Sequence, residues 1–346
     1  MVDVAVIGAA GYAGIEAVRL VLGHPRLRLT LATSATDDGK RIADVYPALA
    51  GSTDLAFSAP EPGRIGEAAS VAVLAVPHTA ALQLAPVLLE MGLTVIDLSA
   101  DFRLQDPDVY EFWYGTPHTS PELLADAVFG LPEMDRSRLH GARLVACPGC
   151  YPTATVLAAM PALKAGLLVG DRVLVDAKSG VSGAGRSVSA GSHYVTVNEA
   201  VAPYQIGSHR HTPEMEQALS IHAGREVSVT FSPHLVPMTR GLLSTVYLEV
   251  QAGFCTSDAV GLYQSYYKDE PFVHVHGAGF MPSTAEVRGS NRASIGVTVD
   301  ERTGTLVAVC AIDNLGKGAA GQAVQCLNAV LGYPETEGFE RPAPVV

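Results

Sequence analysis

Short apolar runs alternate with helical patterns over the first 100 residues of the chain. Runs of four to seven residues rich in valine, isoleucine and leucine predict strands, and apolar positions at helical spacing predict helices between them. The predicted strands are residues 2–7, 27–33, 71–76 and 94–98, and the predicted helices are 15–22 and 79–91. Since short strands separated by helices are typical of sheets covered on both faces, we predict an α/β fold with a Rossmann-type parallel sheet.

The pattern changes after residue 149. A helix is predicted from Pro152 to about Leu163, because proline suits the first helical turn, and a final helix is predicted at 318–331. Several strand-like segments between these helices alternate apolar with polar residues. They are residues 172–177, 227–231, 242–250, 293–299 and 305–312. The second half therefore predicts a central α+β domain with a mainly antiparallel sheet.

Composition limits the classes of protein that the chain can represent. With 346 residues, 48% hydrophobic and 17% charged, it suits a globular protein of about two domains. The formal net charge is −12 and no basic run of five residues occurs, which argues against nucleic acid as a partner.

No membrane segment is expected. Residues 144–163 carry no charge, but Pro148, Gly149, Pro152 and Pro161 interrupt them. The chain starts directly with a predicted strand and lacks the basic start and cleavage site of a signal peptide, so we expect a cytoplasmic protein. Its five cysteines are irregularly spaced and do not predict a disulfide framework.

Three glycines follow the first predicted strand and precede the first predicted helix. Gly8, Gly11 and Gly14 let the backbone approach a pyrophosphate, which then meets the free N–H groups of the helix. The spacing G-x-x-G-x-x-G departs from the usual dinucleotide-binding G-x-G-x-x-G, and an ordinary glycine turn remains the alternative.

The end of the second strand distinguishes between nucleotide cofactors. An NAD site usually places Asp or Glu there, whereas this chain has Thr33-Ser34-Ala35 followed by Lys40 and Arg41. A hydroxyl and nearby cations favour the 2′-phosphate of NADP. The alternative is that Asp37 or Asp38 plays the acid's role.

Cys150 is the candidate nucleophile. It precedes the helix predicted at Pro152, where the helix dipole and free N–H groups stabilise a thiolate. The alternatives are an inert buried thiol, and a redox dithiol or half a zinc site formed with Cys147. Zinc would need two more ligands, and the dense histidine pairs are His209/His211 and His274/His276, so no metal site is predicted.

Polar residues in three further segments suggest contacts with a substrate. His209 or His211, in a loop that leads into a helix at Pro213, could move a proton for a thiolate. The glycine-rich loop 178–186 offers N–H groups and Arg186 to an anion, or else is a flexible connection. Ser99 and Arg103 follow a parallel strand's carboxyl end, where ligands collect, although Arg103 could instead pair with Asp101.

Eight motifs in order along the chain resemble those of the N-acetyl-gamma-glutamyl-phosphate reductase family, NADP-dependent arginine-pathway enzymes related to aspartate-semialdehyde dehydrogenase. They are GAAGYAGIE (8–16), AVPH (75–78), DLSADFRL (97–104), PGCYPT (148–153), KSGVSGAGR (178–186), HRHTPEMEQ (209–217), LVPMTRGLLSTVY (235–247) and DNLGKGAAGQAVQ (313–325). The resemblance covers essentially the whole chain, and PGCYPT is its most specific motif.

The resemblance implies a role for each matching residue. Cys150 matches the nucleophile, and His209 and His211 match the acid/base segment. The positions implied near NADP are Gly8, Gly11, Tyr12, Gly14, Ser34, Lys40, His78, Ser182, Gly183 and Asn314. The positions implied near the small-molecule substrate are Ser99, Arg103, Arg186 and Glu214.

The resemblance also implies the domain organisation and the assembly. Residues 1–149 would form the NADP-binding Rossmann domain, completed by 313–346, and residues 150–312 would form the catalytic and dimerisation domain. A homodimer or homotetramer is expected. Two departures are visible, because many members have Asn in place of Cys147 and Gly in place of Thr79.

The implied reaction is reduction of N-acetylglutamyl 5-phosphate to the 5-semialdehyde through a cysteine thioester. The alternatives are reduction of a carrier-bound aminoadipyl phosphate, aspartate-semialdehyde dehydrogenase activity, and a non-catalytic NADP-sensing regulator on the same fold.

Overall fold

A computed structural model describes residues 1–340 of the chain, which form two compact units. The first unit comprises Met1–Pro148 together with the described residues from Ala319 onward, and the second comprises Gly149–Gly318. The sequence-based division placed its boundaries after residues 149 and 312. Its continuation to residue 346 extends beyond the described residues.

The first unit is built on a six-stranded sheet in which every strand pairing is parallel. Its order is β2-β1-β3-β4-β6-β5, which confirms the predicted Rossmann-type sheet. The strands are β1 (Val2–Ile7), β2 (Leu27–Ala32), β3 (Val71–Leu74), β4 (Thr94–Asp97), β5 (Val128–Phe129) and β6 (Leu144–Ala146). Their side chains are mostly buried, as expected for parallel strands covered on both faces.

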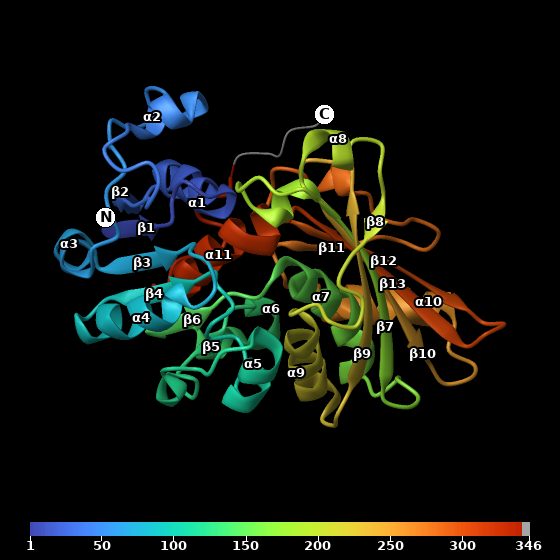
Figure 1. Cartoon of the computed structure of the whole chain (residues 1–346). Coiled ribbons are helices and arrows are strands. Elements are labelled where there is room, and N and C mark those ends of the chain that lie inside the picture. Colours follow the sequence, from blue (N-terminus) through green and yellow to red (C-terminus); the bar gives the residue numbers. More distant parts are fainter. Residues whose placement is uncertain (341–346) are drawn as a thin grey trace. The chain divides into compact units, whose positions relative to one another are not determined.

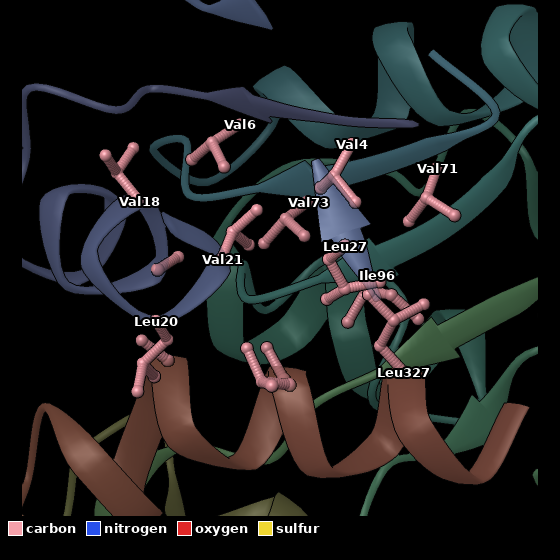
Figure 2. Close-up of a cluster of buried hydrophobic side chains, with 14 of the residues drawn as sticks. Val4, Val6, Val18, Leu20, Val21, Leu27, Val71, Val73, Ile96 and Leu327 are labelled. Atoms are coloured by element: carbon pink, nitrogen blue, oxygen red, sulfur yellow. The ribbon is translucent and has the colours of Figure 1, made fainter. Parts of the chain in front are cut away.

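Helices connect these strands and bury both faces of the sheet in two apolar clusters. They are α1 (Tyr12–Gly23), α2 (Ile42–Val45), α3 (Pro62–Ala68), α4 (Ala80–Glu90), α5 (Pro107–Tyr114), α6 (Pro132–Asp135) and α11 (Gly321–Val330). Figure 1 shows α11, in red, beside α1 within this unit. Figure 2 shows Leu327 of α11 in one cluster with Val21 of α1 and Ile96 of β4.

The last helix begins later than predicted. The pattern placed its start at residue 318, but Gly316–Ala320 form a π-helical segment and α11 starts at Gly321. Apolar spacing alone does not separate an α-helix from the wider turn that precedes it.

The second unit contains a seven-stranded sheet in the order β11-β12-β13-β10-β7-β9-β8. Two pairings, β11 with β12 and β7 with β9, are parallel, and the other four are antiparallel. The strands are β7 (Arg172–Gly180), β8 (Ala202–Pro203), β9 (Ser228–Val236), β10 (Leu242–Glu249), β11 (Val273–Val275), β12 (Ala293–Asp300) and β13 (Thr305–Ile312). The helices are α7 (Cys150–Lys164), α8 (Tyr194–Val197), α9 (Thr212–Ala223) and α10 (Thr256–Tyr266). The predicted mainly antiparallel sheet is confirmed.

Helix α7 is buried on all sides between Tyr151 and Leu163 and packs on the sheet. It starts two residues before Pro152, so the predicted start at Pro152 is wrong. The N–H groups of the first helical residues have no intrahelical acceptor, so proline is tolerated at the third helical position as well as at the first. Proline therefore marks the first turn but not its first residue.

A second proline inside α7 is compensated from outside the helix. Pro161 has no N–H for the carbonyl of Leu157, and the Tyr267 hydroxyl donates to that oxygen instead at 2.7 Å. The Tyr263 hydroxyl donates to the next carbonyl, Ala158, at 2.6 Å. These buried phenols attach α7 to the segment that includes α10.

Within residues 1–340, no helix is long and apolar enough to span a bilayer. The uncharged run 144–163 divides between β6 and α7.

Candidate functional site

Cys150 is the first residue of α7, and Gly149 is its N-cap. The cysteine is partly exposed, whereas Cys147, Cys310 and Cys326 are fully buried. Its sulfur is carried by the first turn, where unpaired N–H groups and the helix dipole stabilise an anion. This position suits a thiolate nucleophile.

The backbone at Gly318 lies against this cysteine. A Cβ added at Gly318 would lie 2.7 Å from Cys150 Cβ, and the Gly318 N–H donates to the carbonyl of Asp313 at 2.9 Å. A glycine is therefore required where the turn after β13 meets Cys150. The sequence analysis missed Gly318, and the only available signal was its place in the DNLGKG motif.

The start of α9 also reaches the nucleophile's segment. His211 is the N-cap of α9, and its Nε2 would lie 2.4 Å from a Cβ added at Gly149. Glu214, which is 1% exposed, accepts the Gly149 N–H on Oε1 at 2.8 Å. Two predicted residues, His211 and Glu214, thus contact the residue before Cys150.

His209 has a different environment from His211. It is buried among the rings of Tyr151, Tyr204 and Phe231, and this burial lowers its pKa to about 4, with Arg210 adding to the effect. Its Nδ1 accepts the His211 N–H at 3.1 Å. His209 is therefore neutral at pH 7, with its ring proton on Nε2.

Three predicted cofactor positions of the second unit lie together. Asn314 donates from Nδ2 to Ser182 Oγ at 2.9 Å and accepts the Gly241 N–H on Oδ1 at 2.8 Å. A Cβ at Gly183 would lie 3.7 Å from Asn314 Nδ2. Arg186, at the end of the same loop, is exposed.

A buried carboxylate supports this group and was not anticipated. Asp313 is fully buried, receives Arg240 Nε at 2.9 Å and accepts the N–H groups of Leu315 and Gly316. It fixes the turn that carries Asn314. The sequence offered only the adjacency of Asp and Asn as a signal.

The glycine turn of the first unit has the close contacts expected of a nucleotide-binding turn. Gly8 has φ +78°, and a Cβ there would lie 2.3 Å from the Ala75 carbonyl oxygen. A Cβ at Gly14 would lie 2.3 Å from the Gly8 carbonyl oxygen, whereas one at Gly11 would meet only an ordinary contact at 3.4 Å. Gly11 is the N-cap of α1, and Tyr12, its first residue, is 37% exposed. The backbone there fits a bound pyrophosphate.

The loop after β2 contains both predicted features that discriminate between cofactors. Ser34 Oγ accepts the Asp37 N–H at 3.1 Å, and Lys40 Nζ pairs with Asp37 Oδ1 at 2.8 Å. The ammonium of Lys40 therefore neutralises Asp37, the residue that could otherwise repel a 2′-phosphate. His78 is exposed, and its ring lies 5.4 Å from that of Tyr114.

Thr79 follows His78 with φ +72°, a left-handed conformation that is strained for a β-branched residue. The Asp101 carboxylate accepts the Thr79 N–H at 3.0 Å and the Ala81 N–H at 3.2 Å. This conformation explains why glycine suits the position in many members of the family that the motifs resemble.

Ser99 and Arg103 are buried with partners inside the first unit. Ser99 donates from both N and Oγ to Asp97, whose own pKa is raised to about 7 by burial. Arg103 donates from Nε to the Cys147 carbonyl at 2.7 Å and from Nη2 to the Leu98 carbonyl at 2.8 Å. Both side chains thus contact residues at the ends of β4 and β6.

The thiol of Cys147 lies in the core of the first unit. The neighbouring Cys326 thiol and burial together raise the pKa of Cys147 well above the usual value. A thiol in this state is unreactive, so Cys147 is an unsuitable redox partner. In residues 1–340, no three or more His, Cys, Asp or Glu side chains are arranged to bind a metal.

Two family models match the chain. "Semialdehyde dehydrogenase, NAD binding domain" matches residues 3–142, and "Semialdehyde dehydrogenase, dimerisation domain" matches residues 150–314.

Curated relatives match almost the full length. The N-acetyl-gamma-glutamyl-phosphate reductase of Citrifermentans bemidjiense is 47% identical over 98% of both chains. Those of Pelobacter propionicus and Symbiobacterium thermophilum are 49% and 48% identical, over 98% and 99% of both chains.

Solved structures share the fold at low sequence identity. Aspartate semialdehyde dehydrogenase II of Vibrio cholerae, complexed with ASA, matches with a TM-score of 0.73 and 16% identity over 96% of this chain and 98% of that one. The Candida albicans aspartate semialdehyde dehydrogenase with NADP matches with a TM-score of 0.71 and 16% identity, over 95% and 98%.

Proposed function

The chain belongs to the N-acetyl-gamma-glutamyl-phosphate reductase family, and from this we propose that it reduces N-acetylglutamyl 5-phosphate with NADPH. The products are N-acetylglutamate 5-semialdehyde, NADP⁺ and inorganic phosphate. The observation that carries the proposal is Cys150 at the N-terminus of α7, beside the backbone contacted by His211.

Cys150 is the nucleophile. Its thiolate attacks the carbonyl carbon of the acyl phosphate, the C–O bond to phosphate breaks, and a thioester remains on sulfur. Reduction of this thioester gives a hemithioacetal, which collapses to the aldehyde and regenerates the thiolate. A thiolate suits both steps because it is a good nucleophile and a competent leaving group.

His211 is the acid/base. Its Nε2 lies beside Gly149, whereas His209 is neutral, enclosed by rings and bonded through Nδ1. His211 protonates the oxyanion that develops on reduction and takes the proton back when the hemithioacetal collapses. His209 sets the position of His211 through the backbone.

The nucleotide is NADPH, which when bound supplies the hydride. Gly8, Gly11, Tyr12 and Gly14 would hold its pyrophosphate at the start of α1, where the close backbone contacts of Gly8 and Gly14 leave no room for side chains. Additional positions near the cofactor are His78, Ser182, Gly183 and Asn314. The Ser34 hydroxyl and the Lys40 ammonium would donate hydrogen bonds to the 2′-phosphate.

The preference for NADPH is testable at the end of β2. Ser34→Asp adds a carboxylate there, so we expect KM for NADPH to rise at least about tenfold while KM for NADH falls. Ser52→Asp, in an exposed loop of the same unit, is the matched control for added charge. An unchanged ratio of the two KM values would remove Ser34 from the cofactor site.

The substrate's anionic groups are bound by arginine and neighbouring donors. Arg186 is the exposed guanidinium of the glycine-rich loop and suits a phosphate or carboxylate. Ser99, Arg103 and Glu214 are the other residues that we propose for substrate binding, and their described contacts are with the protein's own backbone and Asp97.

The reaction is assayed in reverse, as phosphate-dependent reduction of NADP⁺. N-acetylglutamate semialdehyde should support turnover, and aspartate semialdehyde should be at least about a hundredfold poorer in kcat/KM. Cys150→Ser should remove turnover while leaving NADPH binding within twofold. Selective turnover of aspartate semialdehyde, or of a carrier-bound aminoadipate semialdehyde, would overturn the substrate assignment.

The assembly is an oligomer of identical chains in the cytoplasm, a dimer or tetramer. The match of residues 150–314 to a dimerisation domain supports this. A non-catalytic NADP sensor would need the glycine turn but no reactive thiol. Rapid alkylation of Cys150 by iodoacetamide, slowed by substrate, distinguishes the enzyme from such a sensor.

A further inference from the structure

His209 is enclosed by rings from three separate segments. The ring centroid of His209 lies 5.6 Å from Tyr151, 5.5 Å from Tyr204 and 5.2 Å from Phe231. Tyr151 belongs to α7 and Phe231 to β9, whereas Tyr204 directly follows β8. Tyr204 is therefore the wall of this enclosure that comes from outside the main helices and long strands.

The position of Tyr204 is fixed by the pairing of β8 with β9. Ala202 and Pro203 pair with Leu235 and His234, and the Tyr204 N–H donates to the Pro233 carbonyl at 3.1 Å. The preceding segment is largely exposed, with Tyr194 at 72% and Val201 at 63% exposure. Tyr204 is thus the point at which this exposed segment enters the surroundings of the nucleophile.

The hydroxyl of Tyr204 is hydrogen-bonded within the protein. It donates to the Tyr151 hydroxyl at 3.0 Å, and the Tyr151 hydroxyl donates to the His234 carbonyl at 3.3 Å. Burial, with a smaller contribution from Cys150 and against the hydrogen bond to Tyr151, raises the pKa of Tyr204 to about 12, and burial also raises the pKa of Tyr151, so both phenols keep their protons at pH 7. Because both hydroxyls are hydrogen-bonded within the protein, we assign Tyr204 a positional role.

The Tyr204 ring favours the neutral form of His209 by keeping water away from the imidazole. The ionisable neighbours of the His209 ring are Tyr151, Tyr204, Arg210 and His211. While water is excluded from this ring, its Nδ1 accepts the His211 N–H. Admission of water would let the imidazole take a proton on Nδ1. That proton would break the bond to the backbone of His211, whose ring faces Gly149.

We propose that Tyr204 is a positioning residue of the reductase site, whose ring keeps His209 dry and thereby fixes His211 beside the nucleophile's segment. This inference rests on the proposed function. Tyr204 would then influence the acid/base step through His209 and His211, without itself contacting substrate or cofactor.

The test compares three variants in the full chain. Tyr204→Ala opens the enclosure, Tyr204→Phe keeps the ring and removes the hydroxyl, and Tyr194→Ala removes an exposed tyrosine of the preceding segment. The readouts are the pH dependence of Cys150 alkylation by iodoacetamide, followed by peptide mass spectrometry, and kcat and KM in the reverse assay. Alkylation does not depend on which semialdehyde is the substrate.

Tyr204→Ala should add an inflection near pH 6 to 6.5 to the alkylation profile, as His209 returns toward its ordinary pKa of about 6.5. Its kcat should fall about tenfold, with KM for NADP⁺ within twofold. Tyr204→Phe and Tyr194→Ala should keep the wild-type profile. If Tyr204→Ala does not fold, Tyr204→Gln carries the same expectation, since a flexible polar chain also admits water.

Two results would overturn the inference. One is a wild-type alkylation profile in the variant that opens the enclosure, and the other is an equal change in Tyr204→Phe, which would assign the effect to the hydroxyl. Slow alkylation of Cys150 in the wild-type protein would instead contradict the proposed function itself.

Discussion

The glycine turn of the first unit and the nucleophile's surroundings in the second are built in different ways. The turn is made by seven consecutive residues, and its decisive contacts are those of Gly8 and Gly14 with backbone. Cys150, the proposed nucleophile, and the preceding Gly149 are surrounded by segments far apart in sequence, among them the start of α9 and the backbone at Gly318. The turn is therefore one continuous segment whose fit also depends on the backbone at Ala75, whereas the surroundings of Cys150 come from several separate segments of the second unit.

The largest expected effect breaks the local turn. Gly8→Ala places a methyl group 2.3 Å from the Ala75 carbonyl oxygen at a positive φ. We expect NADPH affinity to fall more than about a hundredfold, measured by fluorescence titration, with Cys150 alkylation retained. Gly23→Ala, at the end of the same helix with no atom within 4 Å, is the control.

The next effect breaks the distant contact at the nucleophile. Gly318→Ala places a Cβ 2.7 Å from Cys150 Cβ, which displaces the cysteine or the turn. We expect kcat to fall about a hundredfold while NADPH affinity stays within twofold. Gly261→Ala in α10 has open space and should be near wild type. Equal loss of both properties in Gly318→Ala would contradict the separation of the two regions.

Acid stability sharpens the comparison, because the second unit buries neutral histidines. Burial lowers the pKa of His209 and that of His222, each to about 4. The unfolded chain binds more protons between pH 6.5 and 4, so this stability is present above pH 6.5 and lost on acidification. We expect His209→Phe to reduce the fall in unfolding free energy over this range by up to about 3 kcal/mol, measured by urea titration.

The smallest effect concerns the support of α7. Tyr267→Phe removes the donor that satisfies the Leu157 carbonyl opposite Pro161, at a cost of about 1 to 2 kcal/mol in unfolding free energy. Tyr266→Phe, whose hydroxyl has no hydrogen bond to the described residues, should cost less than about 0.5 kcal/mol. Equal costs would show that the capped carbonyl contributes nothing.

The difference between the two regions explains what could be predicted from the sequence. Strands such as β1 and β3 consist of short apolar runs, so the parallel sheet that they form could be predicted from the local pattern. The short strands β5, β8 and β11 have two or three residues and form only through pairing with neighbouring strands. No sequence pattern predicted them.

The candidate site shows the same limit. Cys150, the histidine segment and the glycine turn were identified from residue type and motif. The sequence did not show that His211 contacts Gly149 while Tyr204 and Phe231, residues outside its motif, enclose His209. Lys40 was identified as a cation near the cofactor, but its pairing with Asp37 required the folded loop.

The most direct test of the central claim is to trap the acyl group on sulfur. With N-acetylglutamate semialdehyde and NADP⁺ but no phosphate, oxidation of the bound aldehyde should stop at the thioester, giving one NADPH per active subunit. Peptide mass spectrometry should then find one N-acetylglutamyl group on Cys150 and none in Cys150→Ser. Full phosphate-dependent turnover with no acyl group on Cys150 under these conditions would contradict the account.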